Sequence, residues 1–216
     1  MGTSVCVDDR ELASQFESLG FNCEFGFVQH DCGWRQGGLL RWALVQPEPL
    51  LRGIASGFEG IYDFANLQPR NPKMVTDQAT GLGFHSAMQS AGGAFVHDEA
   101  ERRRLHLEER DKILAMRDRL LRQLASGRHM FVYKDNAGLA GSHIRKIAAA
   151  VASRGPGRVL HVVAAEQPDQ VGTVEHAGGN LFLGRLRKLW LRDPDPANID
   201  YAGWRTLLRN AVPHLP

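Results

Sequence analysis

The sequence predicts a single α/β domain with a central, mostly parallel sheet flanked by helices. The C-terminal third carries the main signal, because short apolar runs alternate there with an amphipathic stretch in the order strand, helix, strand. This order implies a parallel pair with a right-handed crossover. The length of 216 residues, with 43% apolar and 23% charged residues, suits one globular domain. We therefore expect one domain over 1–216, in which a motif-bearing half, 1–98, precedes a half, 99–216, that holds a long helix and the βαβ unit.

The second half contains the clearest elements. Four apolar residues recur at helical spacing between positions 113 and 124, and charged residues fill the other faces, which predicts a long solvated helix over 99–126. Three buried strands are also expected in this half, at 129–134, 159–164 and 181–186. Two further helices are expected at 142–153 and 200–211.

Shorter elements are expected in the first half. Apolar residues at helical spacing predict a helix over 8–18 that Gly20 ends. Asn22 is suited to cap a second short helix that starts near Cys23. The remaining elements are a strand or helix at 39–45, a helix at about 48–57, and short strands near 73–76 and 83–85 in glycine-rich sequence.

Composition narrows the classes of function. A net charge of +2 does not predict a nucleic-acid partner. No apolar stretch approaches the roughly 20 residues of a membrane span, and the first residues do not resemble a secretory signal. Cys6, Cys23 and Cys32 are then expected as reduced thiols in the cytoplasm. We predict no membrane span and no cofactor, and leave the oligomeric state open.

Cys23 is the first candidate for chemistry. A thiol in the first turn of a helix lies at the positive end of the helix dipole, which lowers the thiol pKa and favours the nucleophilic thiolate. Backbone N–H groups there, together with the amide of Asn22, are suited to hold an oxyanion beside the sulfur. The alternative is that Cys23 is a small buried residue without a catalytic role.

A nucleophilic cysteine also needs a base. Of nine histidines, His85 is the first choice because it ends a glycine-rich run with little bulk around it, and His97, just before the long helix, is the second. A metal site built from Cys23, His30 and Cys32 is not expected, because their spacing matches no common zinc pattern.

A second set of candidates is suited to bind anions. Lys134, Asp135 and Asn136 end the first strand of the βαβ unit, and ligands of parallel sheets bind beyond the C-terminal strand ends. Arg41 is suited to bind a carboxylate or phosphate, or to pair with a neighbouring acid. Trp42, next to it, belongs either to the core or to a binding site. The alternative for Lys134, Asp135 and Asn136 is that they are exposed loop residues without a role in binding.

Two motifs resemble a bacterial family catalogued as papain-like cysteine peptidases. The first is SLGFNCEFGFVQ, from Ser18 to Gln29, and the second is LLRWA, from Leu39 to Ala43. Weaker similarity around His85 and in the C-terminal half extends the resemblance over most of the chain. Members of the family often occur beside genes for surface polysaccharides.

The resemblance implies roles for particular residues. Cys23 matches the cysteine of the first motif and His85 the downstream histidine, while Gln29, Arg41 and Trp42 become candidate binding residues for a small-molecule, peptide or glycan substrate. Related members carry Pro-Phe-Asp-Trp where this chain has Leu-Leu-Arg-Trp, so Arg41 replaces an acid that would orient the histidine.

Three functions follow from these observations. The favoured one is a cysteine-dependent hydrolase or acyl-transfer enzyme with Cys23 as nucleophile and His85 as base. The second is a glycosyl- or other transferase of surface-polysaccharide synthesis, with Lys134 and Arg41 as phosphate ligands. The third is a non-catalytic binding domain, for which Cys23 and His85 should lie more than roughly 10 Å apart, since proton transfer requires hydrogen-bond reach.

Overall fold

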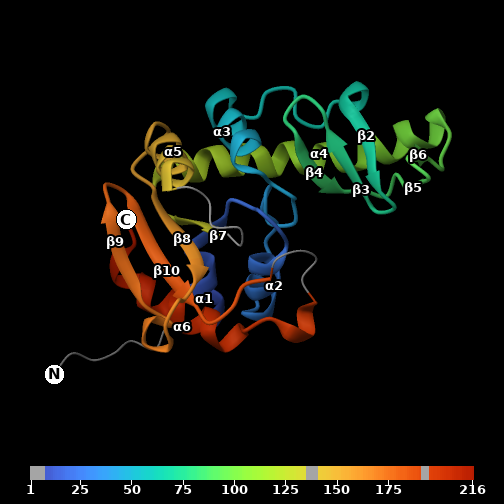
Figure 1. Ribbon diagram of the computed structural model, residues 1–216. Helices are drawn as coiled ribbons and strands as arrows, with labels where there is room; N and C mark the ends of the chain where they lie inside the picture. Colours follow the sequence, from blue (N-terminus) through green and yellow to red (C-terminus); the bar gives the residue numbers. More distant parts are fainter. Residues whose placement is uncertain (1–7, 135–140, 191–194) are drawn as a thin grey trace.

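The computed structural model describes residues 8–134, 141–190 and 195–216, and these form an α/β fold around a five-stranded sheet (Figure 1). The strand order is β1-β7-β8-β10-β9. Neighbouring strands are parallel except at the edge, where β9 runs antiparallel to β10. The mostly parallel sheet confirms the predicted fold class. The strand bounds are Phe16–Ser18 for β1, Met130–Lys134 for β7, Arg158–Ala164 for β8, Val174–Gly178 for β9 and Leu181–Leu186 for β10.

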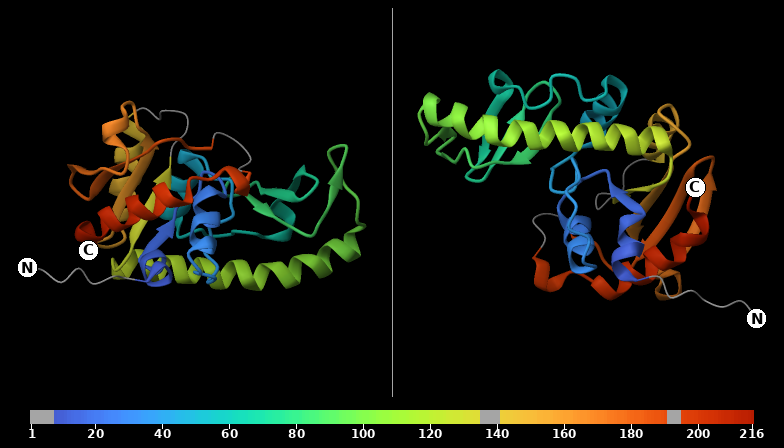
Figure 2. Two further views of the ribbon diagram at one scale, coloured as in Figure 1. Left: turned by 90° about the horizontal axis from the view of Figure 1, so that it is seen from below. Right: turned by 180° about the vertical axis from the view of Figure 1, so that it is seen from behind.

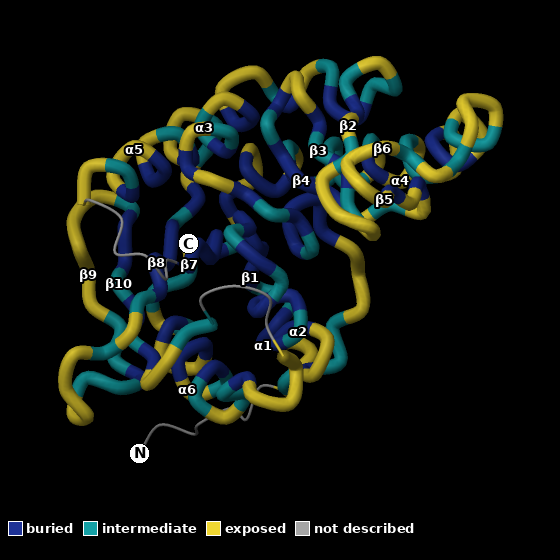
Figure 3. The backbone as a smooth tube through the Cα atoms, turned by 45° about the vertical axis from the view of Figure 1, so that its right-hand side comes forward, coloured by how far each residue is buried: buried dark blue, intermediate teal, exposed yellow. Residues whose placement is uncertain are grey.

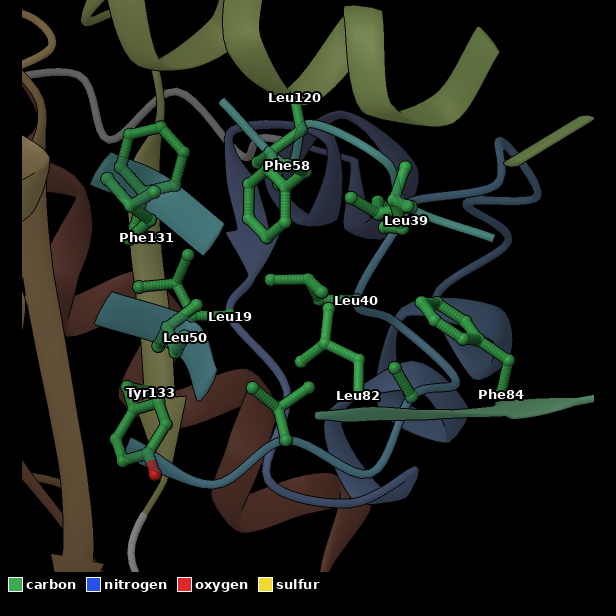
Figure 4. Close-up of a cluster of buried hydrophobic side chains, with 14 of the residues drawn as sticks. Leu19, Leu39, Leu40, Leu50, Phe58, Leu82, Phe84, Leu120, Phe131 and Tyr133 are labelled. Atoms are coloured by element: carbon green, nitrogen blue, oxygen red, sulfur yellow. The ribbon is translucent and has the colours of Figure 1, made fainter. Parts of the chain in front are cut away.

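Side chains of the inner strand β7 alternate between the two faces of the sheet, as the two-residue period of a strand requires. Met130 and Val132 join one buried cluster, whereas Phe131 and Tyr133 join the other (Figure 4). The first cluster is shared with helices α1 (Asp9–Ser14), α2 (Glu24–Asp31) and α6 (Tyr201–Ala211). The second is shared with α3 (Pro47–Ser56), α4 (Glu99–Ser126) and α5 (Gly141–Ala152).

Helix α4 is the longest element and extends well beyond the main sheet (Figure 2). Its bounds equal the predicted ones, because both ends carry clear signals. Asp98 accepts a hydrogen bond from the N–H of Glu101 at the start, and Gly127 adopts the left-handed conformation at the end.

A second sheet and a hairpin lie along the projecting part of α4 (Figures 1 and 2). The sheet contains β2 (Leu67–Asn71), β3 (Met74–Asp77) and β4 (Leu82–His85) in that order, all antiparallel. The hairpin pairs β5 (Ser90–Ala91) with β6 (Ala94–Phe95). Four short 3₁₀ helices, Phe64–Asn66, Pro168–Gln170, Pro196–Asn198 and Val212–His214, complete the described elements.

Several expectations need correction. The helix expected over 8–18 ends at Ser14, because residues 16–18 are buried and pair with β7 as strand β1. Residues 39–45 form turns, with one bridge between Leu44 and Gly83, rather than a regular strand or helix. Strand β9 was not predicted because its residues are mostly exposed and lack an apolar pattern (Figure 3). None of the helices in the described segments combines the length and apolar character needed to cross a bilayer.

Candidate functional site

A sharp turn carries the chain from β1 into α2 and positions Cys23. Gly20 and Phe21 both have positive φ, at 91° and 85°. A Cβ on Gly20 would lie 2.4 Å from a Val45 methyl group, so both the conformation and the space require glycine. Cys23 then occupies the N-cap position of α2, and the side-chain oxygen of Asn22 accepts the Glu24 N–H at 3.0 Å. The predicted capping residue is therefore one position early, although Asn22 does supply the capping hydrogen bond.

His85 reaches Cys23 from the end of β4. The distance from Cys23 Sγ to His85 Nε2 is 3.7 Å, within hydrogen-bond reach for sulfur. Two backbone hydrogen bonds between Leu44 and Gly83, of 2.9 and 3.1 Å, fix β4 against the 39–45 segment. The same segment carries Trp42, whose carbonyl oxygen lies 3.8 Å from the sulfur. Residues 62 positions apart in the chain are thus brought into direct contact.

The Cys23 and His85 side chains line a cavity of about 390 Å³. We call it the Cys23 cavity. Phe27 and Trp42 form an aromatic wall, with ring centroids 5.0 Å apart in an edge-to-face arrangement. The remaining lining residues are Asn22, Leu44, Arg70, Asn71 and Met74.

A buried ion pair lies next to Cys23. Glu24 and Lys134 are each 1% exposed and contact one another. Glu24 also accepts hydrogen bonds from the Trp190 N–H and the Trp204 indole, both at 3.0 Å. Burial lowers the pKa of Lys134, while the negative charges of Glu24 and of a Cys23 thiolate act in the opposite direction.

A carboxylate on α4 holds the chain that follows His85. Glu109 accepts hydrogen bonds from the Ala87 N–H at 2.6 Å, the Ser86 hydroxyl at 2.9 Å and the Tyr62 hydroxyl at 2.7 Å. Burial, and then the hydrogen bond to Glu109, raises the pKa of Tyr62 above its ordinary value. Within the described residues, no carboxylate is hydrogen-bonded to the His85 ring. Glu109 therefore contacts the two residues after His85 rather than the imidazole.

The structure does not bring all predicted site residues to the cavity. Arg41 is buried and donates hydrogen bonds to the backbone oxygens of residues 26, 34 and 36, and burial lowers its pKa to about 10. Gln29 is buried and donates to Phe16 O at 2.8 Å, which joins α2 to β1. Lys134 is committed to Glu24. Each of these three side chains therefore has partners within the protein, and none of the three lines the Cys23 cavity.

The remaining predicted residues divide into three cases. Trp42 lines the cavity, as does Asn22, whose amide also donates to Trp190 O at 3.2 Å. His97 lies just before α4 and is not among the residues that line the Cys23 cavity. Asp135 and Asn136 lie outside the described residues.

Several residues of the site were not predicted. Arg70 and Asn71 lie in a polar edge strand that gave no periodic signal, and Met74 begins the strand expected near 73–76 but was not recognised as a site residue. Glu24 was visible only as an acid in the first turn of a helix. Glu109 was one of many charged residues on the long helix, and nothing in its spacing distinguishes it.

Comparisons with protein-family models, with curated proteins and with solved structures found no match to this chain. In the segments that the structure describes, no group of three or more His, Cys, Asp or Glu side chains is arranged to hold a metal ion.

Proposed function

We propose that this chain is a cysteine-dependent hydrolase or acyl-transfer enzyme in which Cys23 is the nucleophile and His85 the base. The observation that carries the proposal is the 3.7 Å distance from the Cys23 sulfur to His85 Nε2 at the wall of a cavity. A nucleophile and a base in contact, beside space for a substrate, are the minimal requirement for covalent catalysis.

The proposed reaction begins with transfer of the Cys23 thiol proton to His85 Nε2. The thiolate attacks a carbonyl carbon of the substrate, and the carbonyl electron pair moves to oxygen to form a tetrahedral intermediate. When the intermediate collapses, the bond to the leaving group breaks and His85 returns the proton to it, which leaves a thioester on Cys23. Water or another acceptor, deprotonated by His85, then attacks the thioester carbonyl. The bond between the acyl carbon and the Cys23 sulfur breaks, the acyl product leaves, and His85 returns the proton to the sulfur to restore the thiol.

Backbone N–H groups in the first turn of α2 are the proposed donors to the oxyanion. They point toward the start of the helix, where the dipole favours negative charge. The N–H of Glu24 is already bonded to Asn22, and the Asn22 amide donates to Trp190. Through these contacts Asn22 fixes the turn that carries Cys23. Backbone N–H groups, rather than the Asn22 amide, would then donate hydrogen bonds to the oxyanion.

The competing functions have less support. A non-catalytic domain was expected to keep Cys23 and His85 more than roughly 10 Å apart, whereas they are 3.7 Å apart. A transferase was expected to use Lys134 and Arg41 as phosphate ligands, whereas both are buried with protein partners. We also propose that the chain is similar to papain-like cysteine peptidases. The Cys23 thiol would then work in the reducing environment of the cytoplasm.

A panel of activated esters and thioesters tests the proposal. Wild-type protein should release the leaving group with a burst that reports the covalent intermediate, and Cys23→Ser and His85→Ala should each lower kcat/KM by at least about a hundredfold. Cys32→Ala is the matched control, because Cys32 is a buried thiol outside the cavity. Equal activity of the Cys23→Ser variant and the wild type would refute the assignment of the nucleophile.

A further inference from the structure

The charge distribution of the Cys23 cavity is one-sided. Its described lining contains one permanent cation, Arg70, and no Asp or Glu. The other polar members are two asparagines, the cysteine and the histidine, and the rest of the wall is apolar. A cavity of this kind disfavours a positively charged substrate and is suited to an apolar one that carries a negative charge.

Arg70 reaches the cavity because of a β-bulge. Strand β2 pairs Pro69 with Val75 and Asn71 with Met74, so Arg70 is the extra residue of the pair. Successive side chains of a regular strand point to opposite faces, whereas Arg70 and Asn71, adjacent in sequence, both line the cavity. Bulges that redirect a side chain are frequent beside active sites.

The stem of Arg70 lies across β4 on the same face as His85. A Cβ on Gly83 would be 3.5 Å from Arg70 Cδ, which is van der Waals contact distance, so the arginine stem passes directly over this position. Gly83 and His85 are two residues apart on β4 and therefore share one face of the strand. Arg70 thus lies over the strand that carries the base.

The guanidinium group of Arg70 has donors to offer. Its recorded partner is the Thr76 hydroxyl, at 3.3 Å from one terminal nitrogen. Throughout the described residues, no carboxylate lies within ion-pair distance of Arg70. A planar guanidinium with unused donors is suited to bind a carboxylate through two parallel hydrogen bonds.

We propose that the Cys23 site accepts acyl substrates that have an apolar chain and a single carboxylate, which pairs with Arg70. This inference rests on the proposed function and specifies its substrate class. One guanidinium supplies one positive charge, which matches a monoanion. The aromatic wall of Phe27 and Trp42 and the side chains of Leu44 and Met74 would cover the apolar chain between the carboxylate and the reacting carbonyl.

Two 4-nitrophenyl esters that differ in charge and by one methyl group test this inference. One is the hemiester of glutaric acid, and the other is the same molecule with its free carboxylate methylated. Wild-type protein should prefer the charged ester by roughly tenfold in kcat/KM, and Arg70→Gln should bring the ratio of kcat/KM for the two esters close to one.

Lys73→Gln is the matched control. Lys73 is an exposed cation in the turn between β2 and β3 and does not line the cavity. The Lys73 variant should keep the wild-type preference, which separates a local contact from a change in net charge. Circular dichroism and thermal unfolding should show that both variants fold as the wild type does.

The outcomes separate the inference from the proposed function. Hydrolysis of both esters that depends on Cys23, with no difference between wild type and Arg70→Gln, would overturn the role of Arg70 and leave the function standing. An equal loss of charge preference in Lys73→Gln would overturn it as well. No hydrolysis of either ester above that of Cys23→Ala would overturn the proposed function and the inference together.

Discussion

The ion pair between Glu24 and Lys134 leads to a quantitative prediction about stability. Both side chains are 1% exposed, so replacing Lys134 with Met leaves an uncompensated carboxylate in the core. Loss of one partner of a buried pair costs about 3–5 kcal/mol. Glu24 keeps two hydrogen bonds, from the Trp190 N–H and the Trp204 indole, each at 3.0 Å. These two hydrogen bonds replace part of the hydration that the carboxylate would have in water. We therefore expect the loss in free energy of unfolding to be near the lower limit, about 3 kcal/mol.

Urea unfolding followed by circular dichroism gives the measurement, with the double variant Glu24→Gln/Lys134→Met as the control. The double variant contains neither buried charge and should recover on the order of 1–2 kcal/mol relative to Lys134→Met alone. A loss below about 1 kcal/mol in Lys134→Met would refute the reasoning. Strict additivity of the two single substitutions would also contradict it, because residues in contact should be coupled.

Three further predictions concern residues around the site. Glu109→Gln should lower turnover by roughly tenfold with little change in KM, because the residues after His85 lose a charged acceptor. Gly26→Ala should cost about 1–3 kcal/mol in urea unfolding, because its Cβ would lie 3.0 Å from the Trp42 ring and 2.7 Å from a backbone oxygen. Burial lowers the pKa of His129 below 6.5, so the unfolded chain binds more protons as the pH falls through that value. Wild type should therefore lose stability relative to His129→Gln below about pH 6.5 and show no such trend above it.

Each of these predictions has a contrary result. Unchanged turnover in Glu109→Gln would mean that Ser86 and Ala87 keep their position without the carboxylate. Wild-type stability of Gly26→Ala would contradict the close approach of α2 to the 39–45 segment. A stability difference between wild type and His129→Gln that does not change between pH 5 and pH 8 would contradict the lowered pKa.

The elements that were predicted correctly are those whose signal is local. The long helix carries its own cap, glycine stop and apolar stripe, so its bounds followed from the sequence. The strands β7, β8 and β10 were recognised as apolar runs because both faces of a central parallel sheet are buried. Strand β1 was missed because three residues become a strand only through pairing with β7, more than a hundred positions away.

The site shows the same division. A helix starting near Cys23 was predicted from the sequence, and α2 begins at Glu24, the next residue. His85 was nominated from the lack of bulk around it. Of the anion ligands expected at the end of the βαβ strand, Lys134 pairs with Glu24, a residue on a helix packed against the sheet, and the sequence did not reveal this long-range contact. Arg70 was not foreseen, because a bulge in an irregular edge strand determines where its side chain lies.

The pH dependence of Cys23 alkylation tests the central claim most directly. Iodoacetamide labelling, followed residue by residue with mass spectrometry, compares Cys23 with Cys32, whose thiol pKa is raised by burial. The proposed pair of Cys23 and His85 predicts that Cys23 remains reactive at pH 6.5, where an ordinary thiol reacts about a hundredfold more slowly than at its plateau. His85→Ala should return Cys23 to that ordinary behaviour. Labelling of Cys23 that follows an ordinary thiol in the wild type, and does not change in His85→Ala, would contradict the claim.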